Sequence, residues 1–378
     1  MGLGHLRRAH TISREVLAFD PDWNVLIVAD SPWAPFLEPI HGLDYVKLPT
    51  IVKTGRADWR TASLSLEIDE AVRLRAKAIL EAFSEFRPDV LLVDHMPVGA
   101  LGELKPTLDR AATMDDPPRL YLGLRDVLDS PEVIRRVWSD LDAYAYLGHY
   151  EAVLVYGSRD VFDVDAAYAL SPHARRISYC QYATATPKRA GLAEGEREPL
   201  VICTGGGGAD AYPLARAFVE AMPLVREAIP VRAAVLTGPR MSEDERDLLA
   251  RRAAGQPVEL VGGETDASTW METAAAAVTM GGYNTLCELL ARRKKTLVVP
   301  RAGPSAEQRI RTGLFSERRL IAALDPDGVG PDRLARELLR LVGDRSIPNS
   351  DALPRFDGAR RAARLLLARE PALVGAAS

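Results

Sequence analysis

The sequence lacks the features that would tie a chain to a disulfide scaffold, a nucleic acid or a bilayer. Its three cysteines, Cys180, Cys203 and Cys287, lie far apart without metal-ligand spacing or even pairing, which suits a reducing cytoplasm. A formal net charge of -4 provides no basic field for nucleic acid. No apolar run approaches the roughly 20 residues of a membrane span. We therefore expect a cytoplasmic chain with no nucleic-acid partner, and peripheral membrane contact stays open.

What the sequence does contain is an alternation of short apolar runs with helical stretches. The runs are continuous in Val, Ile and Leu and end in turn residues, which is typical of strands buried on both faces of parallel sheets. With 378 residues, the chain is long enough for two domains. We expect strands at 24–30, 89–94, 119–124, 152–157 and 176–180, then at 199–205, 232–238, 257–263, 275–281 and 295–300. The pattern predicts an α/β chain with two doubly wound domains.

A polar stretch with Pro, Gly and many charges predicts the boundary between these domains. We assign an N-terminal domain to 1–183, a linker to 184–198 and a C-terminal domain to 199–355. Helical patterns fill the spaces between strands, notably at 131–149. The tail 356–378 carries one more helical stretch, which we expect to pack back on the N-terminal domain.

The chain opens with a glycine-rich turn that leads into a helix at about 5–19. Gly2 and Gly4 precede His5, and such a turn normally follows a buried strand. Here no strand comes before the turn. Either this is an ordinary N-terminus, or the first strand is missing because the start site was assigned too late; the second explanation is the one we prefer.

A second glycine-rich turn, CTGGGGAD, runs from Cys203 to Asp210 at the end of a predicted strand. Four consecutive glycines at a helix N-terminus expose backbone N–H groups and suit an anion such as phosphate. A flexible loop between two elements is the alternative. No Gly-Lys-Ser/Thr ending follows, so the turn is not a P-loop.

A third turn, MGGYNTLCELL, begins at Met280 and also follows a predicted strand. Gly282 closes the turn, and Asn284 or Thr285 begins a helix. Thr285 and Glu288 are neighbours on one helix face, so a phosphate could rest near Thr285 while Glu288 accepts ribose hydroxyls. Thr-x-x-Glu is also a capping box, which needs no ligand.

A fourth stretch, VVPRAGPSAEQRIR, ends a strand at Pro300 and leads into a helix with several polar side chains. Glu307, Gln308, Arg309 and Arg311 lie near the start of that helix, at the sheet edge where open α/β sheets bind ligands. A solvated helix face is the alternative.

These turns in this order resemble the GT-B glycosyltransferases, and in particular the MurG-like branch, family 28, with its bacterial predicted-glycosyltransferase relatives. The resemblance covers GLGHLRR at the start, LGLRDVLDSPEVIRR in the middle, and MGGYNTLCELL through SAEQRIR. It implies two Rossmann-like domains that face each other across a cleft. It also implies a nucleotide-sugar donor held by the C-terminal domain.

The resemblance assigns donor roles residue by residue. Glu288 would hold the ribose, Thr285 would lie beside the diphosphate, and Glu307 and Gln308 would contact the sugar. The base would lie against the backbone from Val261 to Gly263. The family enzyme has two glutamines where this chain has Glu307 and Gln308, which leaves the donor sugar open. The implied donor-binding set is Gly205, Gly206, Gly207, Gly208, Gly262, Gly282, Asn284, Thr285, Glu288, Glu307 and Gln308.

The resemblance also implies catalytic roles in the N-terminal domain. His5 would face the cleft as a general base, because the helix N-terminus disfavours imidazolium. Asp94 closes a predicted strand and would orient the base or touch the acceptor. A surface histidine and a turn-capping aspartate are the alternatives. Arg125 and Asp126 end another strand, as a structural pair or as acceptor contacts.

The resulting hypothesis is transfer of a sugar from a nucleoside diphosphate, with UDP as the expected nucleotide, to an acceptor hydroxyl with inversion. No Asp-x-Asp motif is present, so we expect no metal ion, and no cofactor is implied. Two alternatives stay open. One is an epimerase or hydrolase on the same fold, and the other is a non-catalytic donor-binding subunit that needs a partner chain.

Overall fold

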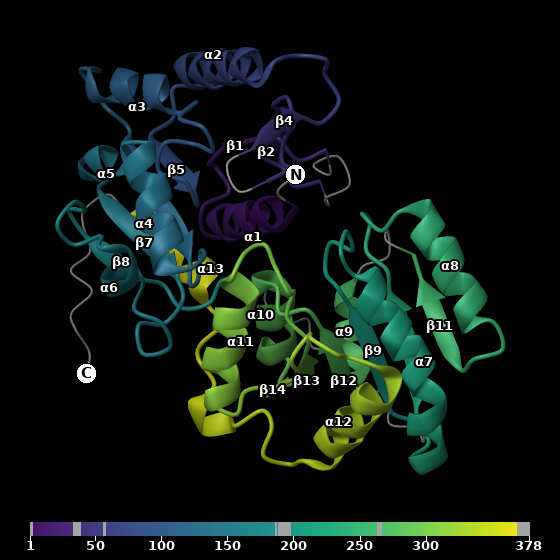
Figure 1. Cartoon of the computed structure of the whole chain (residues 1–378). Helices are drawn as coiled ribbons and strands as arrows, with labels where there is room; N and C mark the ends of the chain where they lie inside the picture. Colours follow the sequence, from purple (N-terminus) through teal and green to yellow (C-terminus); the bar gives the residue numbers. More distant parts are fainter. Residues whose placement is uncertain are drawn as a thin grey trace. The chain divides into compact units, whose positions relative to one another are not determined.

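The computed structural model describes residues 3–32, 39–55, 58–185, 187, 198–262 and 267–368. The chain divides into two compact units (Figure 1). The first unit comprises Met1–Ala183 with Asp357–Ser378, and the second comprises Thr184–Phe356. Both units contain parallel sheets with helices between the strands, which confirms the predicted fold class. Among the described helices, none combines the length and apolarity that a bilayer crossing requires.

The larger sheet of the first unit has four parallel strands in chain order. Its central strands are buried almost throughout, because their side chains are apolar on both faces. All four lie where continuous apolar runs predict them. They are β5 (Val90–Asp94), β6 (Arg119–Arg125), β7 (Ala152–Tyr156) and β8 (Ile177–Tyr179).

Two small sheets complete the strands of this unit. β1 (Val25–Ala29) pairs in parallel with β2 (Leu43–Lys47), and β3 (Ile51–Lys53) pairs antiparallel with β4 (Trp59–Thr61). The continuous apolar run at 24–30 predicts β1, whereas β2, β3 and β4 are not predicted. The second strand, LDYVK, mixes polar with apolar residues and is half-exposed, so it lacks the continuous apolar run of a central strand.

Helices of the first unit connect and cover these strands. The predicted helix at 131–149 is interrupted, because Asp142 adopts a left-handed conformation with φ of 54°. The helices are α1 (Leu3–Phe19), α2 (Ile68–Phe86), α3 (Lys105–Ala112), α4 (Pro131–Asp140), α5 (Ala143–Tyr146), the short 3-10 turn η2 (Leu147–His149), α6 (Val164–Tyr168) and α13 (Gly358–Leu367).

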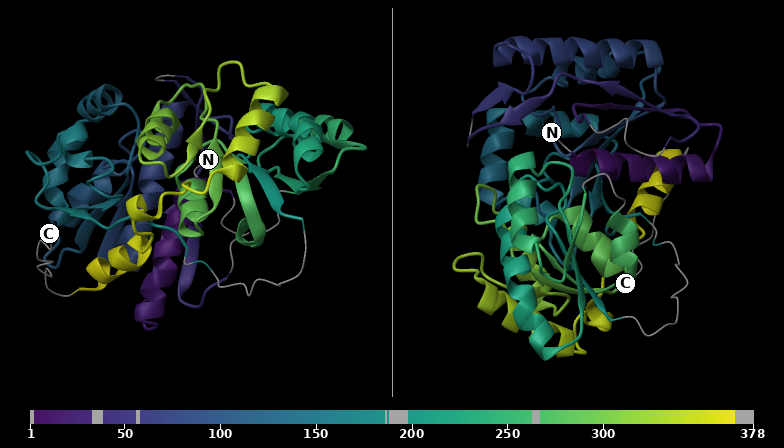
Figure 2. Two further views of the ribbon diagram at one scale, coloured as in Figure 1. Left: turned by 90° about the horizontal axis from the view of Figure 1, so that it is seen from below. Right: turned by 90° about the vertical axis from the view of Figure 1, so that its right-hand side faces the viewer.

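The last helix, α13, belongs to the first unit although the second unit separates it in sequence. It packs along α1 (Figure 2). The guanidinium groups of Arg360 and Arg364 lie over the ring of Phe19. The chain leaves and re-enters the first unit at one place. Ala183 forms an antiparallel bridge with Asp357, and the Gly358 amide donates to the Tyr182 carbonyl oxygen at 3.0 Å.

The second unit is built on one six-stranded parallel sheet. Its order is β11-β10-β9-β12-β13-β14, so the chain crosses over β9 and β10 between β11 and β12. This reversal makes β9 and β12 the switch point, where doubly wound sheets bind ligands at their carboxyl ends. The strands are β9 (Leu200–Thr204), β10 (Arg232–Leu236), β11 (Val258–Val261), β12 (Ala274–Thr279), β13 (Lys295–Val298) and the unpredicted β14 (Ala322–Ala323).

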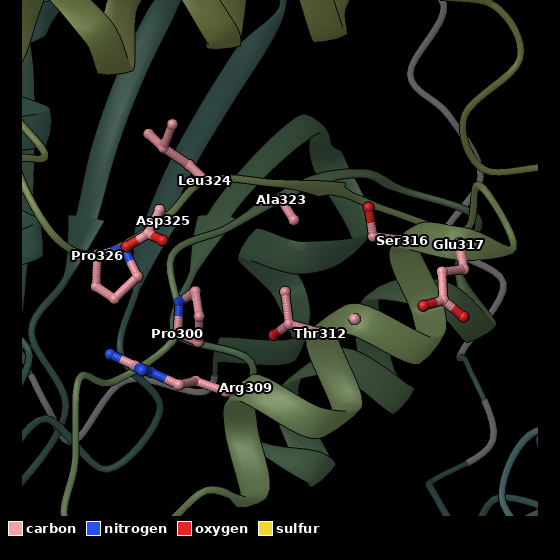
Figure 3. A pocket seen from close by; sticks show the side chains of 10 residues that line it. Pro300, Arg309, Thr312, Ser316, Glu317, Ala323, Leu324, Asp325 and Pro326 are labelled. Atoms are coloured by element: carbon pink, nitrogen blue, oxygen red, sulfur yellow. The ribbon is translucent and has the colours of Figure 1, made fainter.

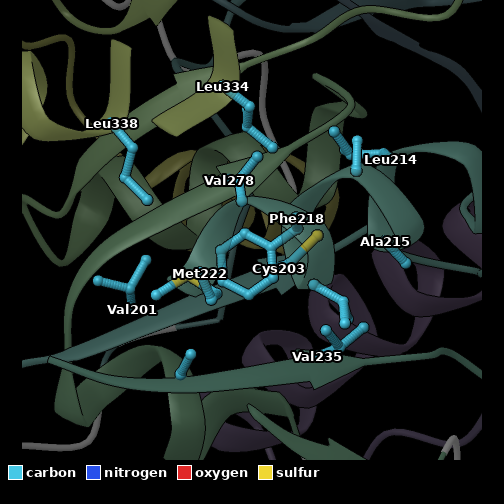
Figure 4. Close-up of a cluster of buried hydrophobic side chains, with 14 of the residues drawn as sticks. Val201, Cys203, Leu214, Ala215, Phe218, Met222, Val235, Val278, Leu334 and Leu338 are labelled. Carbon is cyan, nitrogen blue, oxygen red and sulfur yellow. The ribbon is translucent and has the colours of Figure 1, made fainter. Parts of the chain in front are cut away.

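Helices cover both faces of this sheet. On one face, Val201 and Cys203 of β9 pack with Phe218 and Leu338 in a buried apolar cluster (Figure 4). On the other face, Ile202 belongs to a second cluster. The helices are α7 (Tyr212–Ala228), α8 (Glu243–Ala253), α9 (Ala267–Thr273), α10 (Tyr283–Ala291), α11 (Glu307–Glu317), α12 (Pro331–Gly343) and the short turn η3 (Ser350–Ala352).

Candidate active site

In the first unit, His5 and Asp94 lie in direct contact. Asp94 is the last residue of β5, and His5 is in the first turn of α1. His5 Nδ1 lies 2.5 Å from Asp94 Oδ2. Arg8, one helical turn after His5, donates from Nε and Nη2 to Asp94 Oδ1 at 3.0 and 2.9 Å and from Nη2 to Oδ2 at 2.7 Å. The structure therefore brings together the two residues for which catalytic roles are expected, and adds a buried arginine.

The charge of Asp94 decides the direction of the hydrogen bond to His5. Burial raises the pKa of the Asp94 carboxyl, but the Arg8 guanidinium and His5 more than offset burial and hold that pKa well below its usual range. An ionised carboxylate can only accept. His5 Nδ1 is therefore the donor, and in the tautomer that carries a single proton on Nδ1 the lone pair lies on Nε2. Arg8 Nη2 also lies 3.0 Å from Nδ1, but two donors cannot bond, so that approach is a contact only.

His95 and Tyr156 lie around this pair. The His95 ring centroid is 5.0 Å from that of His5, and His95 has a φ of 76°. Burial, His5 and Arg125 hold the pKa of the His95 ring well below its usual value, so this second imidazole stays neutral. The Arg8 guanidinium lies 5.7 Å from the centre of the Tyr156 ring. Asp126 is buried, and whether it and Arg125 serve an acceptor stays a prediction.

In the second unit, the glycine-rich turn after β9 packs against two other turns. A Cβ at Gly206 would lie 3.1 Å from the hydroxyl oxygen of Thr285. Gly208, with φ of 91°, approaches the Thr237 carbonyl oxygen so closely that a Cβ would lie 2.3 Å from it. The Arg240 amide donates to the Gly207 carbonyl oxygen at 2.9 Å. These contacts require glycine and hold the turn beside Thr285.

The turn after β12 is capped by glycine and not by threonine. Gly282 is the N-cap of α10 and provides no side-chain cap, and Thr285 is the third residue of the helix. The alternative that Thr285 and Glu288 form a capping box is therefore wrong. Asn284 lies in the first turn beside them. Thr285 and Glu288 are 6% and 7% exposed, so both side chains are largely desolvated, and the Thr285 hydroxyl lies next to the glycine-rich turn.

The first residue of α11, Glu307, is paired within the protein. Its Oε1 accepts from Arg311 Nη1 at 2.9 Å, and the same nitrogen donates to the Gly281 carbonyl oxygen at 3.2 Å. Arg311 is fully buried, with its guanidinium 5.5 Å from the centre of the Tyr283 ring. The alternative of a solvated face does not hold for Arg311. The contact ties the start of α11 to the turn before α10.

Gln308 holds the loop that follows β13. Its Oε1 accepts from the Arg301 amide at 2.9 Å, which leaves the side-chain NH2 group as its donor. Arg301 in turn reaches the turn after β9, where Nη2 lies 2.6 Å from Asp210 Oδ2. The loops after β9 and β13 are therefore joined by an ion pair.

A hollow of about 410 Å³ lies on another side of α11, at the carboxyl ends of β13 and β14 (Figure 3). Arg309, Asp325 and Pro326 lie toward one end and Glu317 toward the other. Helical periodicity places Arg309 and Ser316 on the face of α11 opposite Glu307. The hollow thus lies apart from the ion pair of Glu307 and Arg311.

The backbone expected to contact the nucleotide's base lies only partly within the described residues. Val261 ends β11 and Gly262 follows it as an exposed residue. Gly263 lies outside the described residues, as do most residues of the expected linker and the end of the C-terminal tail.

Known structures resemble this arrangement over nearly the whole chain. A glycotransferase of kitacinnamycin is 18% identical with a TM-score of 0.61 and 96% of this chain and 92% of that chain covered. The MurG of Acinetobacter baumannii is 13% identical with a TM-score of 0.55 and 96% and 92% covered. The fold is GT-B.

A further GT-B neighbour is a Listeria monocytogenes protein assigned as a UDP-N-acetylglucosamine 2-epimerase. It is 12% identical with a TM-score of 0.58, and 94% of this chain and 88% of that chain are covered. No protein-family model matches the chain, and comparison with curated proteins gave no match. The neighbours include glycosyltransferases and an epimerase, and the shared feature is the GT-B fold.

Three residues that contact the candidate site were not predicted as site residues from the sequence: Arg8, Arg301 and Asp210. Arg8 had a detectable signal, because residues three apart share a helix face and Arg8 follows His5 by three. Arg301 and Asp210 had none, because their contact depends on two loops that are far apart in sequence.

Proposed function

We propose that the protein transfers a sugar from a nucleoside-diphosphate donor to an acceptor hydroxyl, with inversion and without a metal ion or cofactor. The first unit supplies the base, His5, and the second unit holds the donor. The observation that carries this proposal is the 2.5 Å contact between His5 Nδ1 and Asp94 Oδ2 on a GT-B fold. With Nδ1 donating to the carboxylate, Nε2 is the ring nitrogen that would accept a proton.

In this mechanism His5 Nε2 takes the proton of the acceptor hydroxyl as its oxygen attacks the anomeric carbon. Asp94 accepts the Nδ1–H bond throughout, fixing the ring and stabilising the imidazolium that forms. Arg8 positions the carboxylate through its hydrogen bonds. The bond from the anomeric carbon to the diphosphate breaks, and its electron pair stays on the diphosphate.

We assign the donor to the carboxyl edge of the second sheet. Glu288 would accept the ribose hydroxyls, and the diphosphate would lie by Thr285, Gly206 and Gly282, at the N-terminus of α10. Of the two side chains expected at the sugar, Gln308 keeps an NH2 group for it. Glu307 would have to leave Arg311 or act through it, because the two are paired here.

Two variants test the two units separately. His5→Ala should lower kcat for sugar transfer about 100-fold or more, because a general base is lost, while donor affinity stays as in the wild type. Glu288→Gln should weaken UDP binding about tenfold with little effect on folding. Product analysis by mass spectrometry and NMR is the readout. If an altered or free sugar forms without a glycosylated acceptor, the reaction is epimerisation or hydrolysis and the proposed transfer is wrong. The GT-B epimerase neighbour makes this outcome worth testing.

A further inference from the structure

We propose that Arg301 binds the diphosphate of the donor, and that Asp210 holds its guanidinium when no donor is bound. This inference rests on the proposed function and deepens it, because it names a positive side chain for a site otherwise built from amides. It concerns two residues that the family resemblance leaves without a role.

The ion pair spans the place assigned to the diphosphate. Asp210 belongs to the loop after β9 and Arg301 to the loop after β13, and β12 lies between these two strands in the sheet. A 2.6 Å contact between Arg301 Nη2 and Asp210 Oδ2 therefore crosses the carboxyl end of β12. The turn at Gly281 and Gly282 and the N-terminus of α10 lie at that end. The negative charge of the Asp210 carboxylate thus lies close to the place assigned to the diphosphate of the donor.

The Arg301 backbone is fixed while its side chain keeps a free donor. The amide is held by Gln308 Oε1 at 2.9 Å. The side chain is 39% exposed, yet its Nε is buried and has no hydrogen-bond partner within the described part of the chain. A guanidinium binds phosphate oxygens through two parallel N–H groups, and Nε–H with a neighbouring Nη–H forms one such pair. The unused Nε is what a ligand with two acceptor oxygens would engage.

Exchange of Asp210 for a diphosphate is favourable on physical grounds. Both partners are substantially exposed, at 39% and 50%, and such pairs contribute little to stability because water screens them. A diphosphate carries more negative charge than a carboxylate. During transfer, the anomeric carbon forms a bond to the acceptor oxygen, whose proton goes to His5. The bond to the β-phosphate oxygen breaks with its electron pair, and Arg301 stabilises the charge that grows there.

Arg311 cannot take this role. Its side chain is fully buried and is engaged by Glu307 and by the Gly281 carbonyl oxygen. Arg301 lies in the loop after β13, and its side chain is 39% exposed. The two arginines therefore have different roles: Arg311 fixes the turn before α10, and Arg301 binds the diphosphate.

Isothermal titration of the full chain with UDP and with uridine tests the inference. Arg301→Gln should weaken UDP binding about tenfold or more, because charged hydrogen bonds are lost, and leave uridine binding unchanged. Asp210→Asn should bind UDP at least as tightly as the wild type, because a like charge is removed and the guanidinium is released. Arg251→Gln, on an exposed arginine near the end of α8, is the matched control and should change neither.

The outcomes separate this inference from the proposed function. If the wild type binds UDP and Arg301→Gln binds it equally well, the inference is overturned and the proposed function stands. If Arg301→Gln weakens uridine as much as UDP, Arg301 only shapes the loop and the inference is again overturned. If the wild type binds none of UDP, dTDP, GDP and ADP, both are overturned. Thermal unfolding without ligand shows whether each variant is folded.

Discussion

Asp94 shows how one side chain combines a role in stability with a role in the proposed chemistry. It compensates the charge of Arg8, whose side chain is only 2% exposed, and it fixes the ring of His5. A buried guanidinium without a counter-charge is strongly unfavourable. The carboxylate therefore stabilises the folded unit independently of any ligand.

Asp94→Asn should accordingly lower the free energy of unfolding by about 3 kcal/mol at neutral pH. The pH dependence has a definite sign. The folded pKa of Asp94 lies below the unfolded value of about 3.9, so its stabilisation is complete above about pH 5 and is lost as pH falls toward the folded pKa. Urea titrations at pH 7 and pH 3 measure this.

The control is Asp140→Asn, which changes an exposed carboxylate at the end of α4. It should leave stability within about 0.5 kcal/mol of the wild type. Equal stability of Asp94→Asn and wild type at pH 7 would show that Arg8 finds another partner.

Among the elements, the loops after β9 and β10 form one packed layer above the second sheet. Gly208 lies where a Cβ would meet the Thr237 carbonyl oxygen at 2.3 Å and the Met241 amide nitrogen at 3.1 Å. Both neighbours are backbone atoms, which cannot rotate away. The shape of the glycine-rich turn therefore depends on the neighbouring loop as well as on its own conformational freedom.

Gly208→Ala should destabilise the protein by about 3 kcal/mol, from a positive φ and a backbone clash together, and should weaken UDP binding. Gly255→Ala is the matched control. Its φ of 74° is similar, but nothing lies within 4 Å of the added Cβ. We therefore expect a loss of about 1 kcal/mol in the free energy of unfolding and no change in UDP binding. Thermal unfolding and titration with UDP compare the two variants. Equal losses of stability in both would show that the backbone of the Gly208→Ala variant shifts to relieve the clash.

The elements also show what the sequence could and could not predict. Central strands such as β7 and β9 were predictable, because burial on both faces demands continuous apolar residues. Short or half-exposed strands such as β2 and β14 were not, because no such demand acts on them. In the site, the turns at strand ends were predictable from glycine and spacing. The pairing of Arg311 with Glu307 was not, since the sequence pattern favours a solvated helix face and only tertiary packing buries the guanidinium.

For the whole molecule, the division into two units separates the proposed roles. Every donor-side residue discussed above lies within Thr184–Phe356, whereas His5 and Asp94 lie in the other unit. Each unit has its own buried apolar clusters. Independent folding is the expected result.

A chain of residues 184–356 should therefore fold alone and bind UDP with an affinity close to that of the full chain, without sugar transfer. Circular dichroism and calorimetry are the measurements. A folded fragment that fails to bind UDP, while the full chain binds it, would show that the first unit contributes to donor binding.

The paired crossing points have a consequence for the protein's history and for its redesign. Ala183 and Asp357 form a bridge, and the Gly358 amide donates to the Tyr182 carbonyl oxygen, so the residues before and after the second unit are held side by side within the first unit. A different domain with neighbouring ends could therefore replace residues 184–356 without altering the path of the chain through the first unit. Under the proposed function, such an exchange would change the donor and leave the acceptor-binding residues as they are.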